Sequence, residues 1–187
     1  MRRAAVVLAA GSARRFGSDK LSALLSGEPL VFHAIRAARA APVERVIVVA
    51  HPALGTGAWP GEPAVDVIHL TSDALSLSLR AGVQEAGDVD EVFVFLGDMP
   101  LVPHSVASSL ARQIGGAYAA MPLQSGKPGH PVLLSARAVV DVARLRGDAG
   151  AGKLLRQRDD VRMVETDTPL IHLDIDRSED LRQIGGG

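Results

Sequence analysis

Positively charged side chains gather in a segment of small residues close to the start of the chain, at residues 8–20. Small residues allow a ligand to approach the backbone closely, so that backbone N–H groups can act as hydrogen-bond donors. Arg14, Arg15 and Lys20 lie on this segment, and such cations can neutralise the charge of a triphosphate. An ordinary turn with solvated basic side chains fits this composition equally well.

A carboxylate marks a second segment with unusual chemistry. Asp98 follows an apolar run at residues 91–96 and precedes Met99 and Pro100. At the end of a buried strand, a carboxylate is well placed to hold Mg²⁺, which prefers oxygen ligands and keeps several waters. The alternative for Asp98 is a structural role, in which its side chain accepts hydrogen bonds from nearby N–H groups of the turn.

The glycine motifs of nucleotide-binding folds do not account for residues 8–20, which match neither G-x-G-x-x-G nor the Walker A motif. Residues 147–154 do satisfy G-x-x-x-x-G-K, but Leu154 stands where Walker A requires Ser or Thr for Mg²⁺. They also follow a predicted helix instead of a strand. We therefore do not interpret residues 147–154 as a P-loop.

The elements that must position these residues alternate between strands and helices. Continuous apolar runs predict buried strands, and apolar stripes at helical spacing predict amphipathic helices. The predicted strands are 4–9, 45–49, 65–70, 91–96, 117–121, 132–134, 161–164 and 171–175, and the predicted helices are 29–41, 76–86, 103–114, 136–145, 151–156 and 178–184. This order predicts a Rossmann-like, three-layer α/β/α fold with a mostly parallel sheet. Ligands bind beyond the carboxyl ends of such strands, where both segments lie.

The composition restricts the classes of function. The 187 residues fit a single domain, residues 1–187, without an interdomain linker. A net charge of −1 and 3% aromatic residues argue against a nucleic-acid partner. The absence of cysteine excludes disulfides, thiolate catalysis and cysteine-type zinc sites. Since no apolar run approaches the length of a membrane span or a signal peptide, we expect a cytoplasmic protein without membrane contact.

Four motifs, in the right order, resemble those of the MobA-like NTP transferase family, and within it most closely the molybdenum cofactor cytidylyltransferases. Residues 8–20 are similar to the family's L-A-A-G-x-S-x-R-x-G-x-x-K, and residues 76–82 to its S-x-S-L-R-x-G. Residues 97–100 are similar to its G-D-x-P, and residues 129–131 to its G-H-P. The resemblance covers nearly the whole chain and implies a sheet of the nucleotidyltransferase type.

The resemblance implies a role for each of these segments. The implied catalytic residues are Arg15, Lys20 and Asp98, with the two cations on the phosphates and Asp98 on Mg²⁺. Asp174 would be a second metal ligand, because residues 173–176 are similar to the start of the family's D-I-D-T-P-E-D. The implied nucleotide-binding residues are Leu8, Ala9, Ala10, Gly11, Ser12, Ser78, Arg80 and Gly82. The implied acceptor-binding residues are His130 and Lys153.

Several positions depart from the family's pattern or permit a structural reading. Ala13, Pro128 and Gly152 stand where the family usually has Ser, Arg and Arg. Lys153, next to Gly152, could replace that arginine, although it lacks the planar fork. Structural alternatives also exist: the side chain of Ser76 or Ser78 could cap a helix, and that of Asp176 could cap the last one.

The implied reaction is transfer of CMP from CTP to molybdopterin with release of pyrophosphate, and Mg²⁺ is the implied cofactor. Ala10 favours CTP, because the guanylyl branch more often has Gly there, and GTP stays open. The alternatives are a cytidylyl-, uridylyl- or guanylyltransferase that acts on another phosphorylated acceptor, and a catalytically silent nucleotide-binding partner of a molybdenum enzyme. A molybdenum hydroxylase apo-enzyme or its chaperone is the implied protein partner.

Overall fold

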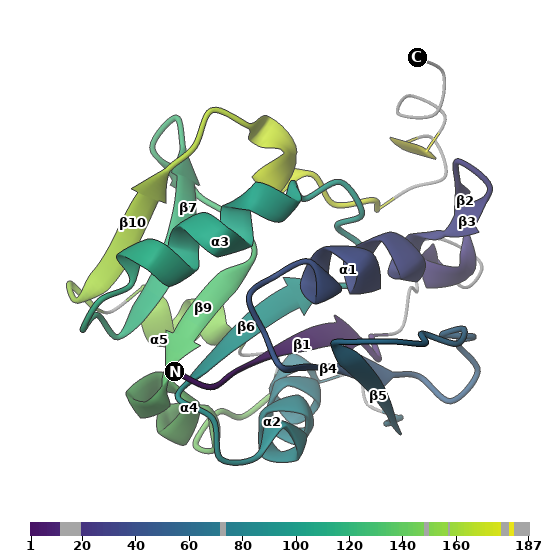
Figure 1. Ribbon diagram of the computed structural model, residues 1–187, viewed down its shortest axis with the longest axis horizontal. Coiled ribbons are helices and arrows are strands. Elements are labelled where there is room, and N and C mark those ends of the chain that lie inside the picture. Colours follow the sequence, from purple (N-terminus) through teal and green to yellow (C-terminus); the bar gives the residue numbers. More distant parts are fainter. Residues whose placement is uncertain (12–19, 72–73, 148–149, 157, 177–179, 182–187) are drawn as a thin grey trace.

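A twisted, mostly parallel sheet organises the chain in the computed structural model, which describes residues 1–11, 20–71, 74–147, 150–156, 158–176 and 180–181 (Figure 1). The strands of this sheet are β1 (Arg3–Ala9), β4 (Arg45–Ala50), β5 (Ala64–His69), β6 (Glu91–Leu96), β7 (Ala119–Gln124), β8 (Lys127–Pro128), β9 (Val132–Ser135) and β10 (Val161–Glu165). Their order is β10-β7-β9-β6-β1-β4-β5, with β8 paired to β7. β1 pairs in parallel with β4 and β6, while β9 runs antiparallel between β6 and β7.

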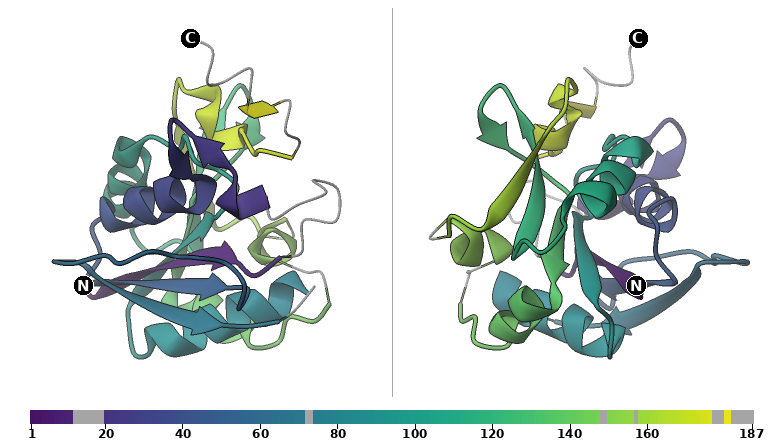
Figure 2. Two further views of the ribbon diagram at one scale, coloured as in Figure 1. Left: turned by 90° about the vertical axis from the view of Figure 1, so that its right-hand side faces the viewer. Right: turned by 60° about the vertical axis from the view of Figure 1, so that its left-hand side comes forward.

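Helices cover both faces of this sheet, which gives the predicted three layers (Figure 2). The helices are α1 (Leu30–Arg39), α2 (Leu75–Ala86), α3 (His104–Gln113), α4 (Ala136–Val142) and α5 (Ala151–Leu155), with 3₁₀ turns η1 (Lys20–Ser22) and η2 (Pro169–His172). One core cluster lies between the sheet and α1 with α3, and a second lies between the sheet and α2, α4 and α5. A short hairpin of β2 (Leu24–Leu25) and β3 (Glu28–Pro29) precedes α1.

The predicted α/β fold with a mostly parallel sheet is confirmed, and most predicted elements agree with the observed ones to within a few residues. The buried apolar strands are central because both of their faces are covered by helices. In the described ranges, no helix combines the length and the apolar character that crossing a lipid bilayer requires.

One prediction of local structure is wrong, and one structural alternative is excluded. The strand predicted at 171–175 is instead the turn η2 followed by extended chain, because Thr168 accepts a hydrogen bond from the Leu170 N–H at 3.2 Å and Pro169 begins the turn. The N-cap of α2 is Ala74, with no side-chain cap, so neither Ser76 nor Ser78 serves as the cap. The predicted last helix, 178–184, is described only at residues 180–181, which are helical.

Gly82 allows α2 to lie directly on the sheet. A Cβ atom at this position would lie 2.9 Å from Val49 Cγ2 and closer still to Val6 Cγ1. These valines belong to the central strands β4 and β1, which cannot move without disturbing the core. The absence of a side chain at Gly82 therefore sets the distance between α2 and the two strands whose carboxyl ends face the predicted site.

We predict that Gly82→Ala lowers the free energy of unfolding. Overpacking a core costs about 1–3 kcal/mol, and the closeness of both valines places this substitution at the upper end of that range. This cost exceeds the roughly 1 kcal/mol that Ala gains over Gly in helix propensity. Urea denaturation measures the difference. The matched control is Gly152→Ala in α5, where the nearest atom is the Arg156 side-chain Nη1 at 3.7 Å and stability should hold or rise. A Gly82→Ala protein as stable as the wild type would contradict this account.

Candidate active site

The two segments singled out in the sequence meet at one edge of the sheet. β1 and β6 are parallel neighbours, with Leu8 opposite Leu96, so both strands end at the same edge. The N–H of Gly97 donates to the Leu8 carbonyl at 2.9 Å. A Cβ on Gly97 would lie 3.1 Å from that carbonyl oxygen, so glycine permits the close approach of the two turns. As a result, Asp98 is held beside the carboxyl end of β1.

Lys20 joins three distant parts of the chain. Its ammonium group donates to Asp98 Oδ2 at 2.8 Å and to Asp176 Oδ1 at 2.9 Å. The residue is 9% exposed, so its charge is largely removed from water. Burial has the largest single effect on the Lys20 pKa and lowers it, but the hydrogen bonds and charges of Asp98 and Asp176 outweigh it and raise the pKa above its usual value. Lys20 is therefore a fixed cation at neutral pH.

Three carboxylates converge around this ammonium group. Oxygens of Asp98, Asp174 and Asp176 all lie within 4.8 Å of one another. The N–H of Ile175 donates to the Asp98 carbonyl at 2.9 Å, and the Ile175 side chain is fully buried in a small cluster with Leu25 and Leu30. This anchor brings the two C-terminal carboxylates to the end of β6.

The donor set suits a hard divalent cation. Burial raises the pKa of Asp174, and the negative charge of Asp176 adds to this effect. A carboxyl group in that situation gains from a nearby cation, and oxygen ligands of this kind suit Mg²⁺ or Mn²⁺. The structure thus places the predicted ligands Asp98 and Asp174 together and adds Asp176, whose contact with Lys20 the sequence did not predict.

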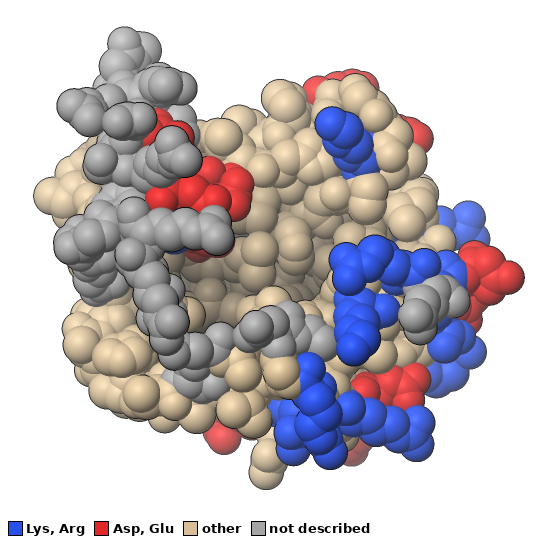
Figure 3. Space-filling view, turned by 180° about the vertical axis from the view of Figure 1, so that it is seen from behind, with Lys and Arg blue, Asp and Glu red and all other residues tan. Residues whose placement is uncertain are grey.

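A pocket of about 560 Å³ opens beside the carboxyl ends of β1 and β6. Leu8, Val94 and Leu96 form an apolar part of its lining, and the positively charged side chains that line it are Arg146, Lys153 and Arg156. Figure 3 shows a hollow on this face, with acidic side chains on one side of it and Lys and Arg side chains gathered on the other. The pocket therefore offers an apolar surface and an anion-binding wall within one cavity.

His130 lines the same pocket from the start of β9. Its N–H donates to the Ile171 carbonyl at 3.0 Å, and its buried Nδ1 has no hydrogen-bond partner among the described residues. Burial lowers the His130 pKa, although the charge of Asp98 and a hydrogen bond with the Val94 backbone oppose this shift. The imidazole is therefore neutral at pH 7, and its Nδ1 is both unsatisfied and shielded from solvent.

The residues expected to bind the nucleotide occupy different environments. Ala9 and Ala10 are each 2% exposed, and Ala10 belongs to the core beneath α2. Gly11 is exposed, Ser78 is buried in α2, and Arg80 is half-buried. Ser12 and Arg15, like the departure at Ala13, lie outside the described residues. Gly82 has a demonstrated role in packing α2 against the sheet, and its role toward a nucleotide stays a prediction.

The structure brings the expected acceptor-binding residues to one cavity and adds two cations to it. His130 and Lys153 both line the pocket, together with Arg146 and Arg156, which the sequence did not single out. The available signal was their position close to residues 147–154, with Arg146 directly before this segment and Arg156 two residues after it. Arg146, Lys153 and Arg156 take part in none of the ion pairs of the described residues.

Residues 5–161 match the MobA-like NTP transferase domain. A Pyrococcus furiosus protein named "Probable molybdenum cofactor guanylyltransferase" is 36% identical over 110 residues, which cover 57% of this chain and 53% of that protein. The crystal structure of the Mycobacterium sp. strain JC1 homologue of Mycobacterium tuberculosis Rv0371c superposes with a TM-score of 0.84 at 27% identity, covering 100% of this chain and 97% of that one.

A crystal structure of Rv0371c from Mycobacterium tuberculosis H37Rv, described as a complex with manganese, shares the fold with a TM-score of 0.82, 23% identity and full coverage of both chains. The chain spans about half the length of the first curated relatives it matches. The family match extends over most of the chain, from β1 into β10. This chain belongs to the MobA-like NTP transferase family.

We predict that the three carboxylates bind Mn²⁺ in the absence of nucleotide. Asp98→Asn should weaken the affinity by at least about tenfold, because even partners outside the first coordination shell typically contribute 10- to 100-fold to metal affinity. Lys20→Met should strengthen it, since the ammonium group now competes for Asp98 and Asp176. Electron paramagnetic resonance measures free Mn²⁺. Asp88→Asn is the control, because the Asp88 side chain is 95% exposed and its ion-pair partner among the described residues is Arg2. Equal affinities of the wild type and Asp98→Asn would refute the site.

Proposed function

We propose that this member of the MobA-like NTP transferase family is a nucleotidyltransferase that joins a nucleoside monophosphate to a phosphorylated acceptor. The observation that carries the proposal is the position of the buried Lys20 among Asp98, Asp174 and Asp176. This cluster lies at the carboxyl edge of the sheet, where the cationic and apolar pocket opens. Cation-binding carboxylates and anion-binding cations at one edge are what a metal–triphosphate complex requires.

The reaction needs neutralised charge and aligned groups more than a protein nucleophile. An oxygen of the acceptor's phosphate attacks the α-phosphorus of the triphosphate, the bond from that phosphorus to the bridging oxygen breaks, and pyrophosphate leaves with the electron pair. Lys20 and Arg15 would stabilise the charge that develops on the α-phosphate and on the leaving pyrophosphate. Asp98 and Asp174, with Asp176 beside them, would hold Mg²⁺, which neutralises phosphate charge. Because this reaction uses no protein nucleophile, it agrees with the absence of cysteine in the sequence.

The remaining assignments divide the proposed contacts between the two substrates. On the nucleotide side, the proposed contacts are Leu8, Ala9, Ala10, Gly11, Ser12, Ser78, Arg80 and Gly82. On the acceptor side, Lys153 would bind a phosphate oxygen, and the neutral imidazole of His130 would lie against the acceptor in the same pocket. Both acceptor contacts lie in the pocket of about 560 Å³, which leaves room for a small molecule of the size of a pterin.

For the substrates themselves, we propose CTP and molybdopterin. Ala10 supports CTP, because members of the guanylyl branch more often have glycine at this position. GTP is the second candidate, because curated relatives such as the Pyrococcus furiosus protein are named molybdenum cofactor guanylyltransferases. Those names also support molybdopterin as the acceptor. A cytoplasmic location and delivery of the product to a molybdenum hydroxylase or its chaperone complete the proposal.

We predict pyrophosphate release when the protein is incubated with Mg²⁺, CTP and molybdopterin. CTP should give a higher kcat/KM than GTP, ATP or UTP, and omission of Mg²⁺ should abolish release. A preference for GTP would replace our assignment of the base while keeping the reaction. Tight binding of nucleotide without pyrophosphate from any triphosphate would instead indicate a catalytically silent nucleotide-binding protein. Turnover with a sugar phosphate but not with molybdopterin would change the acceptor.

We further predict that Asp98→Ala and Lys20→Met each reduce kcat by about 100-fold or more. Removal of one group that stabilises transition-state charge typically costs a factor of this size. Circular dichroism should show an unchanged fold, because both side chains lie at the edge of the sheet and outside the two main core clusters. Asp88→Asn, on the exposed surface, should keep full activity. Near-normal turnover by Asp98→Ala would remove that residue from the catalytic centre.

A further inference from the structure

A second cavity, of about 450 Å³, lies beside α4 and α5, behind the basic wall of the active-site pocket. Two cations, Arg146 and Lys153, line both cavities. Arg144 and Arg158 line only the second cavity, whereas Arg156 lines only the first. The cationic ridge formed by Arg146 and Lys153 thus has a cavity on each side, and the proposed reaction uses only one of them.

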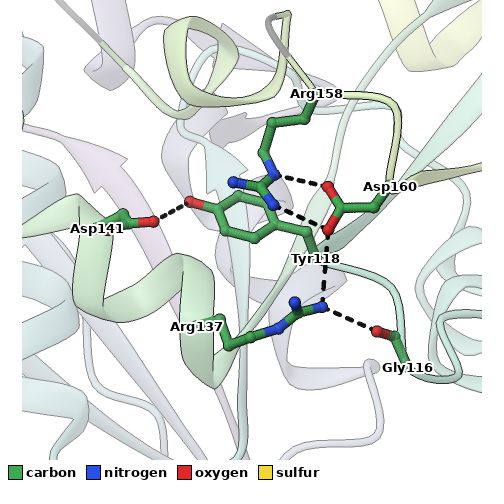
Figure 4. Close-up of polar contacts among 6 residues, drawn as sticks. All are labelled: Gly116, Tyr118, Arg137, Asp141, Arg158 and Asp160. Atoms are coloured by element: carbon green, nitrogen blue, oxygen red, sulfur yellow. Dashed lines mark hydrogen bonds and ion pairs between the residues drawn. The ribbon is translucent and has the colours of Figure 1, made fainter.

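One wall of this second cavity is built from side chains that hold each other in place (Figure 4). The guanidinium carbon of Arg158 lies 3.7 Å from the centre of the Tyr118 ring. The same guanidinium donates to both carboxylate oxygens of Asp160, at 2.6 and 2.9 Å. Asp160 is also within 3.8 Å of Arg137, which donates to the Gly116 carbonyl at 3.0 Å. Stacking and a bidentate ion pair therefore fix the plane of Arg158 before any ligand arrives.

The carboxylate that lines the cavity is already in use. Asp141 accepts a hydrogen bond from the Tyr118 hydroxyl at 2.9 Å and another from Arg144 at 2.9 Å. Burial, together with the hydrogen bond and charge of Asp141, raises the pKa of Tyr118 to about 12, so the phenol keeps its proton and remains a donor. Asp141 is thus satisfied by Tyr118 and Arg144, and Asp160 pairs with Arg158, which leaves Arg146 and Lys153 without a carboxylate partner among the described residues.

Positive charge is in excess within this concave surface. Among the described residues, four cations line the cavity against the single carboxylate of Asp141. Within the described part of the chain, the hydrogen bonds of the Arg146 side chain go to backbone carbonyls, those of Ala143 at 3.2 Å and Leu145 at 2.8 Å. Lys153 is exposed and belongs to none of the ion pairs of the described residues. Several cations with unused donors around one small concave surface suit a small polyvalent oxyanion.

We propose that this cavity is a second anion subsite that binds an oxyanion of the phosphate class. Arg144 and Arg158 would bind the anion from one side, and Arg146 and Lys153 from the ridge shared with the active-site pocket. Two sources carry this chemistry: free phosphate, or an anionic group of the acceptor that lies far from its reacting phosphate and reaches across the ridge. Only the second source rests on the proposed function.

The test is calorimetric titration of the protein with inorganic phosphate at low, constant ionic strength. Arg144→Glu should weaken binding by about tenfold or more, since a hydrogen bond to a charged group is typically worth a factor of that size. The Arg144 side chain is 78% exposed, so the fold should tolerate this change. Arg112→Glu, on α3 at the other face of the sheet, makes the same change of charge and should leave the affinity unaltered. Arg156→Glu changes only the active-site pocket and should have little effect on this subsite.

The same affinity in Arg144→Glu and in the wild type would overturn the proposal, as would a loss confined to Arg156→Glu. The KM for the acceptor separates the two sources. A higher KM for the acceptor in Arg144→Glu, with an unchanged KM for the triphosphate, assigns the subsite to the acceptor. Unchanged KM values together with weakened phosphate binding assign it to free phosphate. Absence of turnover with every triphosphate would refute the proposed function. The titration with inorganic phosphate would still show whether the second anion subsite exists.

Discussion

The burial of one ammonium group constrains much of this structure. Lys20 is 9% exposed, and a charge so far removed from water is tolerated only when it is paired and hydrogen-bonded. Its partners, Asp98 and Asp176, are 78 and 156 residues away in the sequence. The segment after β1, the turn after β6 and the C-terminal segment must therefore meet at one point. That point is the carboxyl edge of the sheet, where the pocket also opens.

The packing around Lys20 brings these three segments together, although no large hydrophobic core lies at that point. Gly97 lets the turn after β6 lie against the end of β1, and Gly82 lets α2 lie against the opposite face of the same strands. Ile175, with Leu25 and Leu30, forms a small cluster separate from the two main cores. It anchors the C-terminal carboxylates through contacts that do not involve them. Because the apolar anchor and the charged cluster are distinct, a change of the carboxylates leaves the anchoring of the segment intact.

The sequence predicted those parts of the site that depend on the backbone, but not those that depend on side chains from distant segments. Lys20 and Asp98 were expected to meet because parallel strands end at the same edge of a sheet. Asp176 and Arg146 were missed, since their contacts depend on where loops after the strands turn back. A strand was predicted at 171–175, yet the local hydrogen bond to Thr168 selected a turn at its start. The apolar side chains of Ile171 and Ile175 are fully buried, so the sequence predicted burial at these two positions but not the backbone conformation.

The two sides of the hollow carry opposite charges and therefore favour ligands of opposite charge. The carboxylates around Lys20 favour a cation, whereas the wall of Arg146, Lys153 and Arg156 favours an anion. A free triphosphate would meet the repulsion of the carboxylates, and a free metal ion must compete with the Lys20 ammonium group. In the proposed reaction, a triphosphate that brings its metal ion would meet the carboxylates without that repulsion, and the phosphate of the acceptor would face the basic wall. Under this proposal, the separation of charge across the pocket gives the two substrates different positions, and Lys20 exchanges its carboxylate partners for phosphate oxygens.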